Sequence, residues 1–91
     1  MLSDIPKKLS GKKEEIDAEI ARAGMIAELD ATTLYEQMAA MASDKSLKET
    51  LLDIAKEEKT HMGEFQALLL KFDKQQAKEL QEGKKEVEEK G

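Results

Sequence analysis

The chain has 91 residues, no cysteine and a net charge of −5, with 20 acidic against 15 basic side chains. This length is enough for one small domain, and the missing cysteines exclude disulfides, zinc fingers and iron–sulfur clusters. The acidic balance disfavours nucleic-acid binding through phosphate neutralisation. No run approaches the ~18 apolar residues of a membrane helix, residues 1–13 lack the apolar core of a signal peptide, and a small domain without disulfides is typical of the cytoplasm.

The pattern along the chain predicts an all-α protein. Residues 1–11 hold the only proline and are expected to form a flexible leader. A first helix is predicted over residues 12–42, which are rich in helix-forming Ala, Glu, Met and Leu. A short polar break follows, in which Asp44 or Ser46 could cap a second helix over residues 47–72. So short a break predicts an antiparallel hairpin.

The remaining residues are more polar. A third helical stretch is predicted over residues 75–82, ending at Gly83, and the charged residues 84–91 are expected to fray. The expected organisation is therefore a leader (1–11), a helical domain (12–82) and a charged tail (83–91).

Two polar side chains interrupt an otherwise apolar stripe on the second helix. Its members recur at alternating spacings of four and three residues and so share one face: Leu47, Leu51, Ile54, Glu58, His61, Phe65 and Leu68. The two polar members form a Glu-x-x-His motif that contains the only histidine of the chain.

The first helix repeats this arrangement with a single carboxylate. Its stripe of small and apolar residues consists of Ala21, Gly24, Glu28, Ala31, Tyr35, Met38 and Ala42. Glu28 precedes Asp44 by sixteen residues and Glu58 follows it by fourteen, which is about 24 and 21 Å from the turn at ~1.5 Å per residue. We therefore expect Glu28, Glu58 and His61 to converge at one level of the hairpin.

These three side chains are half of a known ligand set. Helical di-iron sites take two Glu and two Glu-x-x-His motifs from four helices, so two chains would have to build one site together. Imidazole and carboxylate ligands suit iron, and two irons with open positions could pass electrons to oxygen. Zinc or manganese could occupy the same ligands. Tyr35 could hydrogen-bond a ligand or simply pack.

Other interpretations of these residues remain open. A Glu-x-x-His motif occurs by chance, and a histidine in a stripe can simply bond a neighbouring Glu. Gly24 and Ala31 could make room for a partner helix or ions, or could reflect ordinary close helix packing. The acids on other faces could guide cations to the site, but such residues are more often solvated: Asp30, Glu36, Glu57 and Glu64.

Residues 27–38 (AELDATTLYEQM) and 51–65 (LLDIAKEEKTHMGEF) closely resemble the encapsulated ferritins, the ferritin-like cargo of encapsulin nanocompartments. The resemblance covers roughly residues 20–73 and is nearest to archaeal forms in which this domain precedes an encapsulin shell protein. It implies a dimer that forms a ferritin-like four-helix bundle with a ferroxidase centre at its interface. It also implies a ring-shaped decamer and a shell that stores the iron mineral.

The family's metal ligands fall on Glu28, Glu58 and His61, and its tyrosine beside the site falls on Tyr35. Members often carry an acid at the position of Ala27 and a tryptophan at that of Leu34, so Asp30 alone represents the region where metal ions are thought to enter.

The short docking peptide of a cargo protein has no counterpart in residues 86–91. We therefore expect either the N-terminal part of a fused shell protein or another route to the shell.

The sequence thus predicts a ferroxidase with two irons per dimer interface, Fe(II) and O2 as substrates, and no nucleic-acid or membrane partner. It is expected in the cytoplasm, inside an encapsulin nanocompartment. Two alternatives remain: a rubrerythrin-like di-iron peroxidase, whose family usually carries the full ligand set in one chain, and a non-catalytic helical oligomerisation module with Glu58–His61 pairs in its core.

Overall fold

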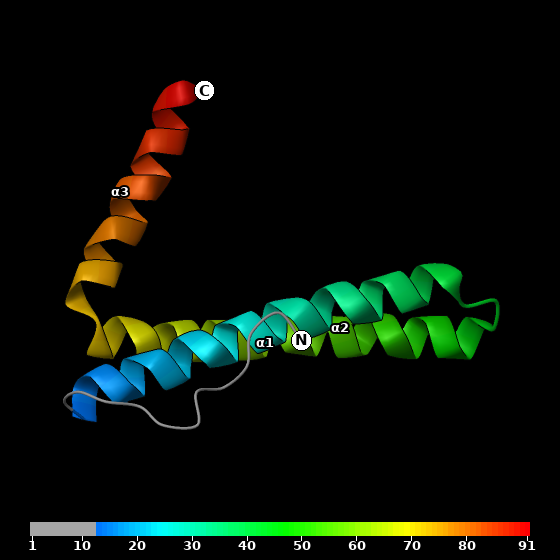
Figure 1. The fold of residues 1–91 in the computed structure, drawn as a ribbon. Helices are drawn as coiled ribbons and strands as arrows, with labels where there is room; N and C mark the ends of the chain where they lie inside the picture. The colour runs from blue at the N-terminus through cyan, green and yellow to red at the C-terminus, as the bar shows by residue number, and fades with distance from the viewer. Residues whose placement is uncertain (1–12) are drawn as a thin grey trace.

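Three helices make up residues 13–91, the part of the chain that the computed structural model describes, and no strand occurs there. Helix α1 spans Lys13–Met41, α2 spans Lys45–Phe72 and α3 spans Lys74–Lys90. The first two lie side by side and antiparallel (Figure 1). The predicted all-α hairpin with a further C-terminal helix is therefore confirmed, while the leader over residues 1–11 and the helix start at Lys12 lie outside the described residues.

The turn of the hairpin is fixed by Asp44. Its carboxylate accepts a hydrogen bond from the Leu47 backbone N–H at 2.8 Å, and its carbonyl accepts from the Lys48 N–H at 3.0 Å. This N-cap satisfies donors that have no partner inside the helix. Ser46 already lies within α2, so Asp44 is the cap, and the alternative in which Ser46 caps the helix is wrong.

Small residues dominate the contact between the two helices. The buried positions are Ala18, Ala21, Thr32 and Ala39 on α1 and Leu51, Ala55 and Leu69 on α2. Short side chains allow two helices to approach closely, so the contact brings side chains of both within reach of each other. The predicted stripe of α2 is only partly buried by this contact, because Leu47 and Leu68 remain 51% and 45% exposed.

One glycine of α1 is explained by a close contact with α2. A Cβ atom on Gly24 would lie 2.6 to 2.7 Å from three ring carbons of Phe65, which is far inside the usual 3.5–4.0 Å separation of carbon atoms. The space at Gly24 is thus filled by an aromatic ring of the same chain. Gly24 was predicted either to make room for a partner helix or ions or to allow close helix packing. The structure shows close helix packing.

An apolar surface of the hairpin is left exposed by residues 13–91. On α1 it includes Ile20, Leu34 and Met38, and on α2 it includes Leu47 and Leu68, each between 36% and 52% exposed. The two stripes adjoin, because Ile20 and Leu68 line the same hollow. We call this surface the open face. Exposed apolar residues at helical spacing on both helices are typical of a surface that packs against another molecule.

Helix α3 leaves the hairpin at the end opposite the turn and points away from it (Figure 1). Asp73 joins it to the hairpin: its carboxylate accepts from the Gln76 N–H at 3.0 Å, its own N–H donates to the Leu69 carbonyl at 2.8 Å, and it lies 3.8 Å from the Arg22 guanidinium. No residue of α3 is buried.

The prediction that this helix ends at Gly83 is wrong, because α3 continues to Lys90. Glycine costs a helix only about 1 kcal/mol relative to alanine, and no proline follows. Beyond it, oppositely charged side chains stand four residues apart, Lys84 with Glu88 and Glu86 with Lys90, a spacing that supports a helix. The charged residues 84–91, which were expected to fray, thus lie in a helical register as far as Lys90.

Replacing Gly83 by alanine should strengthen the last two turns of α3. The added methyl group meets nothing within 4 Å, and the gain of up to about 1 kcal/mol corresponds to roughly fivefold slower local opening. Amide hydrogen exchange of residues 84–90 would measure it, with Gly83→Pro as the opposite variant. Exchange that neither substitution alters would show that residues beyond Gly83 are not helical in solution.

Candidate metal centre

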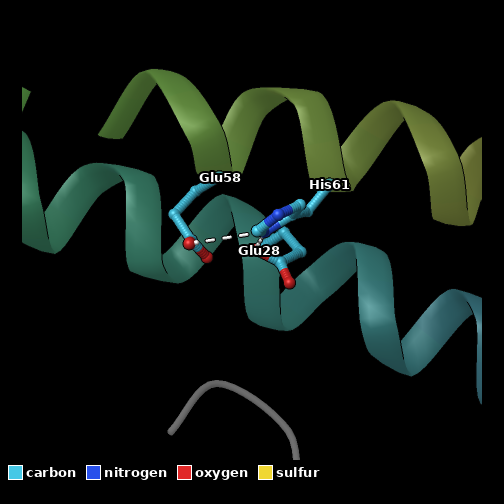
Figure 2. Close-up of side chains that lie close together, drawn as sticks. All are labelled: Glu28, Glu58 and His61. Atoms are coloured by element: carbon cyan, nitrogen blue, oxygen red, sulfur yellow. Dashed lines mark ion pairs between the residues drawn. The ribbon is translucent and has the colours of Figure 1, made fainter. Parts of the chain in front are cut away.

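Two helices bring three potential metal ligands to one point. Glu28 extends from α1, while Glu58 and His61 extend from successive turns of α2, and the three point toward one another (Figure 2). One ligand atom from each lies within 4.8 Å of the others, and residues 13–91 contain no other such group of three. The convergence expected from the spacing therefore occurs in the fold. The assignment of these residues as metal ligands stays a prediction.

The three side chains approach without satisfying each other's hydrogen-bonding capacity. His61 Nδ1 lies 3.6 Å from Glu28 Oε2 and 3.5 Å from Glu58 Oε1, both beyond the 2.7–3.2 Å of a normal N–H···O bond. Glu28 Oε2 is buried and has no hydrogen-bond partner within residues 13–91. A buried oxygen acceptor without a donor costs free energy, and a cation placed between the three groups would remove that cost.

The electrostatics of the cluster also favour a positive charge. The pKa of Glu28 is raised above 4.5, first by a hydrogen bond that its protonated form shares with Glu58, then by burial, and then by the negative charge of Glu58. His61 opposes this shift. Two carboxyl groups that share a partly buried site disfavour each other's ionisation. A bound metal ion would stabilise both in the ionised form.

The cluster is open on one side. The side chains of Glu28 and Glu58 are 17% and 18% exposed, whereas that of His61 is 45% exposed. His61 lies seven residues from Leu68 and fourteen from Leu47, two and four helical turns, so all three project toward the same side of α2. The ligands are therefore accessible from the open face, where the chain leaves the coordination sphere of an ion incomplete.

Two contacts near the cluster lie outside the predictions from sequence, one within α1 and one between α1 and α2. The Thr32 hydroxyl donates to the Glu28 carbonyl at 2.8 Å, and Lys59 forms an ion pair with Glu36 across the two helices at 3.1 Å. Glu36 was one of the acids that could guide cations, but its carboxylate is held by this lysine. The Lys59–Glu36 pair depends on the register of the two helices, which no local sequence motif specifies.

The other candidate residues lie on α1 outside the cluster. Asp30 and Tyr35 are both half-buried, and Asp30 is not a member of the group formed by Glu28, Glu58 and His61. Their roles, at the point where metal ions enter and beside the site, stay predictions.

The donor set fits a metal ion. Two carboxylates and one imidazole suit divalent cations such as iron, manganese or zinc. A cation would offset the free-energy cost of the unpartnered Glu28 oxygen and of the two neighbouring carboxyl groups. Three side chains would leave positions of a bound ion free, for a second chain or for small molecules.

Comparison with known proteins identifies relatives of this fold. No family model matches the chain. A ferritin-like-encapsulin shell fusion protein from Pyrococcus furiosus is 54% identical over 77 residues, which are 85% of this chain and 22% of that protein. The chain thus spans about a fifth of that relative. No helix within residues 13–91 is both long and apolar enough to cross a membrane.

A solved structure matches almost the whole chain. The crystal structure of an encapsulated ferritin domain from Pyrococcus furiosus superimposes with a TM-score of 0.84 and 47% identity, over 98% of this chain and 94% of that one. Such identity across nearly the full length of both chains reflects common ancestry as well as a common fold. The chain belongs to the encapsulated ferritins.

Proposed function

We propose that the protein is a ferroxidase that oxidises Fe(II) to Fe(III) at a two-iron centre shared between two chains. The observation that carries this proposal is the cluster of Glu28, Glu58 and His61, with its buried, unpartnered carboxylate oxygen. A cluster held together by internal hydrogen bonds would serve stability alone. In this one, His61 Nδ1 lies beyond hydrogen-bond distance of both carboxylates, and the cluster lies open to the surface.

Sharing between two chains follows from the number of ligands. A ferritin-like di-iron site uses two Glu and two Glu-x-x-His motifs, and this chain supplies one of each. His61 lies toward the open face, so a second chain packed there would face the cluster with its own three ligands. The same contact would cover Ile20, Leu47 and Leu68, whose exposure costs free energy.

The ligands of this chain account for the direction of the reaction. Glu28, Glu58 and His61 would hold the iron, and each Fe(II) would supply one electron, with O2 as the acceptor. Glu28 and Glu58 are hard, negatively charged ligands and stabilise the more highly charged Fe(III) over Fe(II). The His61 imidazole adds a neutral ligand that keeps the total charge moderate. The burial of the two carboxylates strengthens these effects by excluding water.

Storage of the product requires a separate container, because the hairpin of residues 13–72 encloses no cavity for a mineral. The relative from Pyrococcus furiosus combines a ferritin-like part and an encapsulin shell in one protein. We propose that this chain acts in the cytoplasm inside an encapsulin shell, as a ring of five dimers that delivers Fe(III) for mineral storage.

Anaerobic titration with Fe(II) tests the shared centre. One tightly bound iron per chain is expected, together with an even-numbered oligomer, because each chain supplies half of a two-iron ligand set. Bound iron and molar mass would be measured on the same samples. An oligomer that forms regardless of iron, with no tight binding, would leave Glu58 and His61 as polar residues of a helical oligomerisation module.

Removal of a ligand should abolish Fe(II) oxidation. Loss of an outer partner of a metal ligand typically costs 10–100-fold, so Glu28→Ala and His61→Ala should each reduce the rate by roughly 100-fold or more. Oxygen consumption and Fe(III) absorbance would report it. Glu57→Ala is the matched control, since Glu57 is an exposed neighbour of Glu58. Equal loss in all three variants would contradict the assignment.

The carboxyl pair should make the metal-free protein less stable as the pH rises. The pKa of Glu28 is higher in the folded state than its ordinary 4.5, so the folded state binds more protons between the two values, and the free energy of unfolding falls as the pH rises through them. Glu28→Gln should remove this dependence, and Glu57→Gln should keep it. Denaturant unfolding in the presence of a chelator would measure both. A slope unchanged by Glu28→Gln would show that the two carboxyls do not interact.

A further inference from the structure

The strongest unexplained contact outside the ligands lies one turn from them. Gly24 precedes Glu28 by four residues on α1, and Phe65 follows His61 by four residues on α2. Because the helices are antiparallel, both steps run in the same direction, away from the turn. The Gly24–Phe65 contact therefore forms the next layer of the hairpin, about 6 Å along the axis from the ligands.

We propose that Gly24 and Phe65 are positioning residues that set the distance between α1 and α2 at the metal centre. This inference rests on the proposed metal site. The ring of Phe65 lies directly on the position that a side chain of residue 24 would occupy, so the helices are as close as a ring against bare backbone permits. Glu28 reaches Glu58 and His61 across the gap that this contact defines.

The contact cannot adjust easily. Among the three ring carbons close to Gly24 is Cγ, whose position is fixed by the first side-chain torsion alone. Rotation of the ring about its own axis would leave Cγ where it is. Within a helix, steric contact with the preceding turn restricts that torsion to two common values. A methyl group on residue 24 must therefore change the torsion of Phe65 or push the helices apart by about 1 Å to restore a normal carbon–carbon distance.

A displacement of this size matters for metal binding. Ligand distances in a working metal site hold to about ±0.2 Å, while the ligand atoms here already spread over 4.8 Å without an ion. A shift of about 1 Å one turn away would place Glu28 outside the tolerance for an ion held by Glu58 and His61. One alternative response exists, because a hollow of about 280 Å³ beside Phe65, lined by Ile20 and Leu68 among others, could accept the displaced ring.

Titration of the metal-free protein with Co(II) alone tests the proposal, because the visible absorption of Co(II) reports both affinity and ligand geometry. Gly24→Ala should weaken Co(II) binding at least tenfold and change its spectrum. Combining it with Phe65→Leu, which removes the ring that the methyl group would meet, should restore affinity to within about threefold of the unsubstituted protein. A purely structural role would change the melting temperature but neither affinity nor spectrum.

Gly63→Ala is the matched control. It adds the same methyl group to the hairpin two residues from His61, at a position with nothing within 4 Å, and should leave Co(II) binding unchanged. Equal weakening in Gly63→Ala and Gly24→Ala would overturn the proposal, since helix stiffness rather than the ring contact would then be responsible. Unchanged binding in Gly24→Ala would also overturn it, as the ring would have moved into the hollow.

Phe65→Leu alone and the unsubstituted protein cover the remaining outcomes. If Gly24→Ala does not fold, as judged by circular dichroism, Phe65→Leu alone provides the test, because it removes the ring without adding atoms. Its binding should be at least threefold weaker, and unchanged binding would refute the positioning role. If the unsubstituted protein does not bind Co(II), the proposed metal site fails and the positioning role fails with it. Tight binding by the unsubstituted protein together with indifference to residues 24 and 65 refutes the positioning role alone.

Discussion

The most demanding constraint on the hairpin is the meeting of two carboxyl groups and an imidazole between its two helices. A hydrogen bond between protonated Glu28 and Glu58, burial, and the negative charge of Glu58 together raise the pKa of Glu28. The arrangement costs stability in the chain alone. Such a cost at one level of an otherwise small and apolar contact is typical of a functional site, and a bound cation is the simplest way to remove it.

One event, the binding of a second chain, would relieve both the unfavourable carboxyl pair and the exposure of the open face. The hairpin buries little beyond alanines and a few leucines, and a chain of this length gains limited stability from its own core. A second chain on the open face would bury the exposed leucines and complete the ligands in one step. Metal binding, dimer formation and folding would then be thermodynamically linked, because an ion that binds only the assembled state stabilises that state.

Much of the hairpin could be predicted because its signals are local. The break at Asp44 is a capping signal, and the levels of Glu28 and Glu58 follow from counting residues at a constant rise. The end of α3 could not be predicted from Gly83 alone, because one glycine costs a helix only about 1 kcal/mol and the charge pairs beyond it offset part of that cost. The rotation of each helix was also only partly predicted: Leu47 and Leu68 share a stripe with buried Leu51, since the stripe spans two contact surfaces and the periodicity does not separate them.

By itself, the sequence determined the helical class, the turn, the relative heights of Glu28, Glu58 and His61, and the family resemblance, because each depends on residue type and spacing along one chain. Only the tertiary structure decided which side chains of α1 and α2 meet each other. It placed the ring of Phe65 on Gly24, paired Lys59 with Glu36, left Glu28 Oε2 without a partner and turned His61 toward an uncovered surface. These features depend on how far apart and at what rotation two helices pack, which is set by the sum of many side-chain contacts.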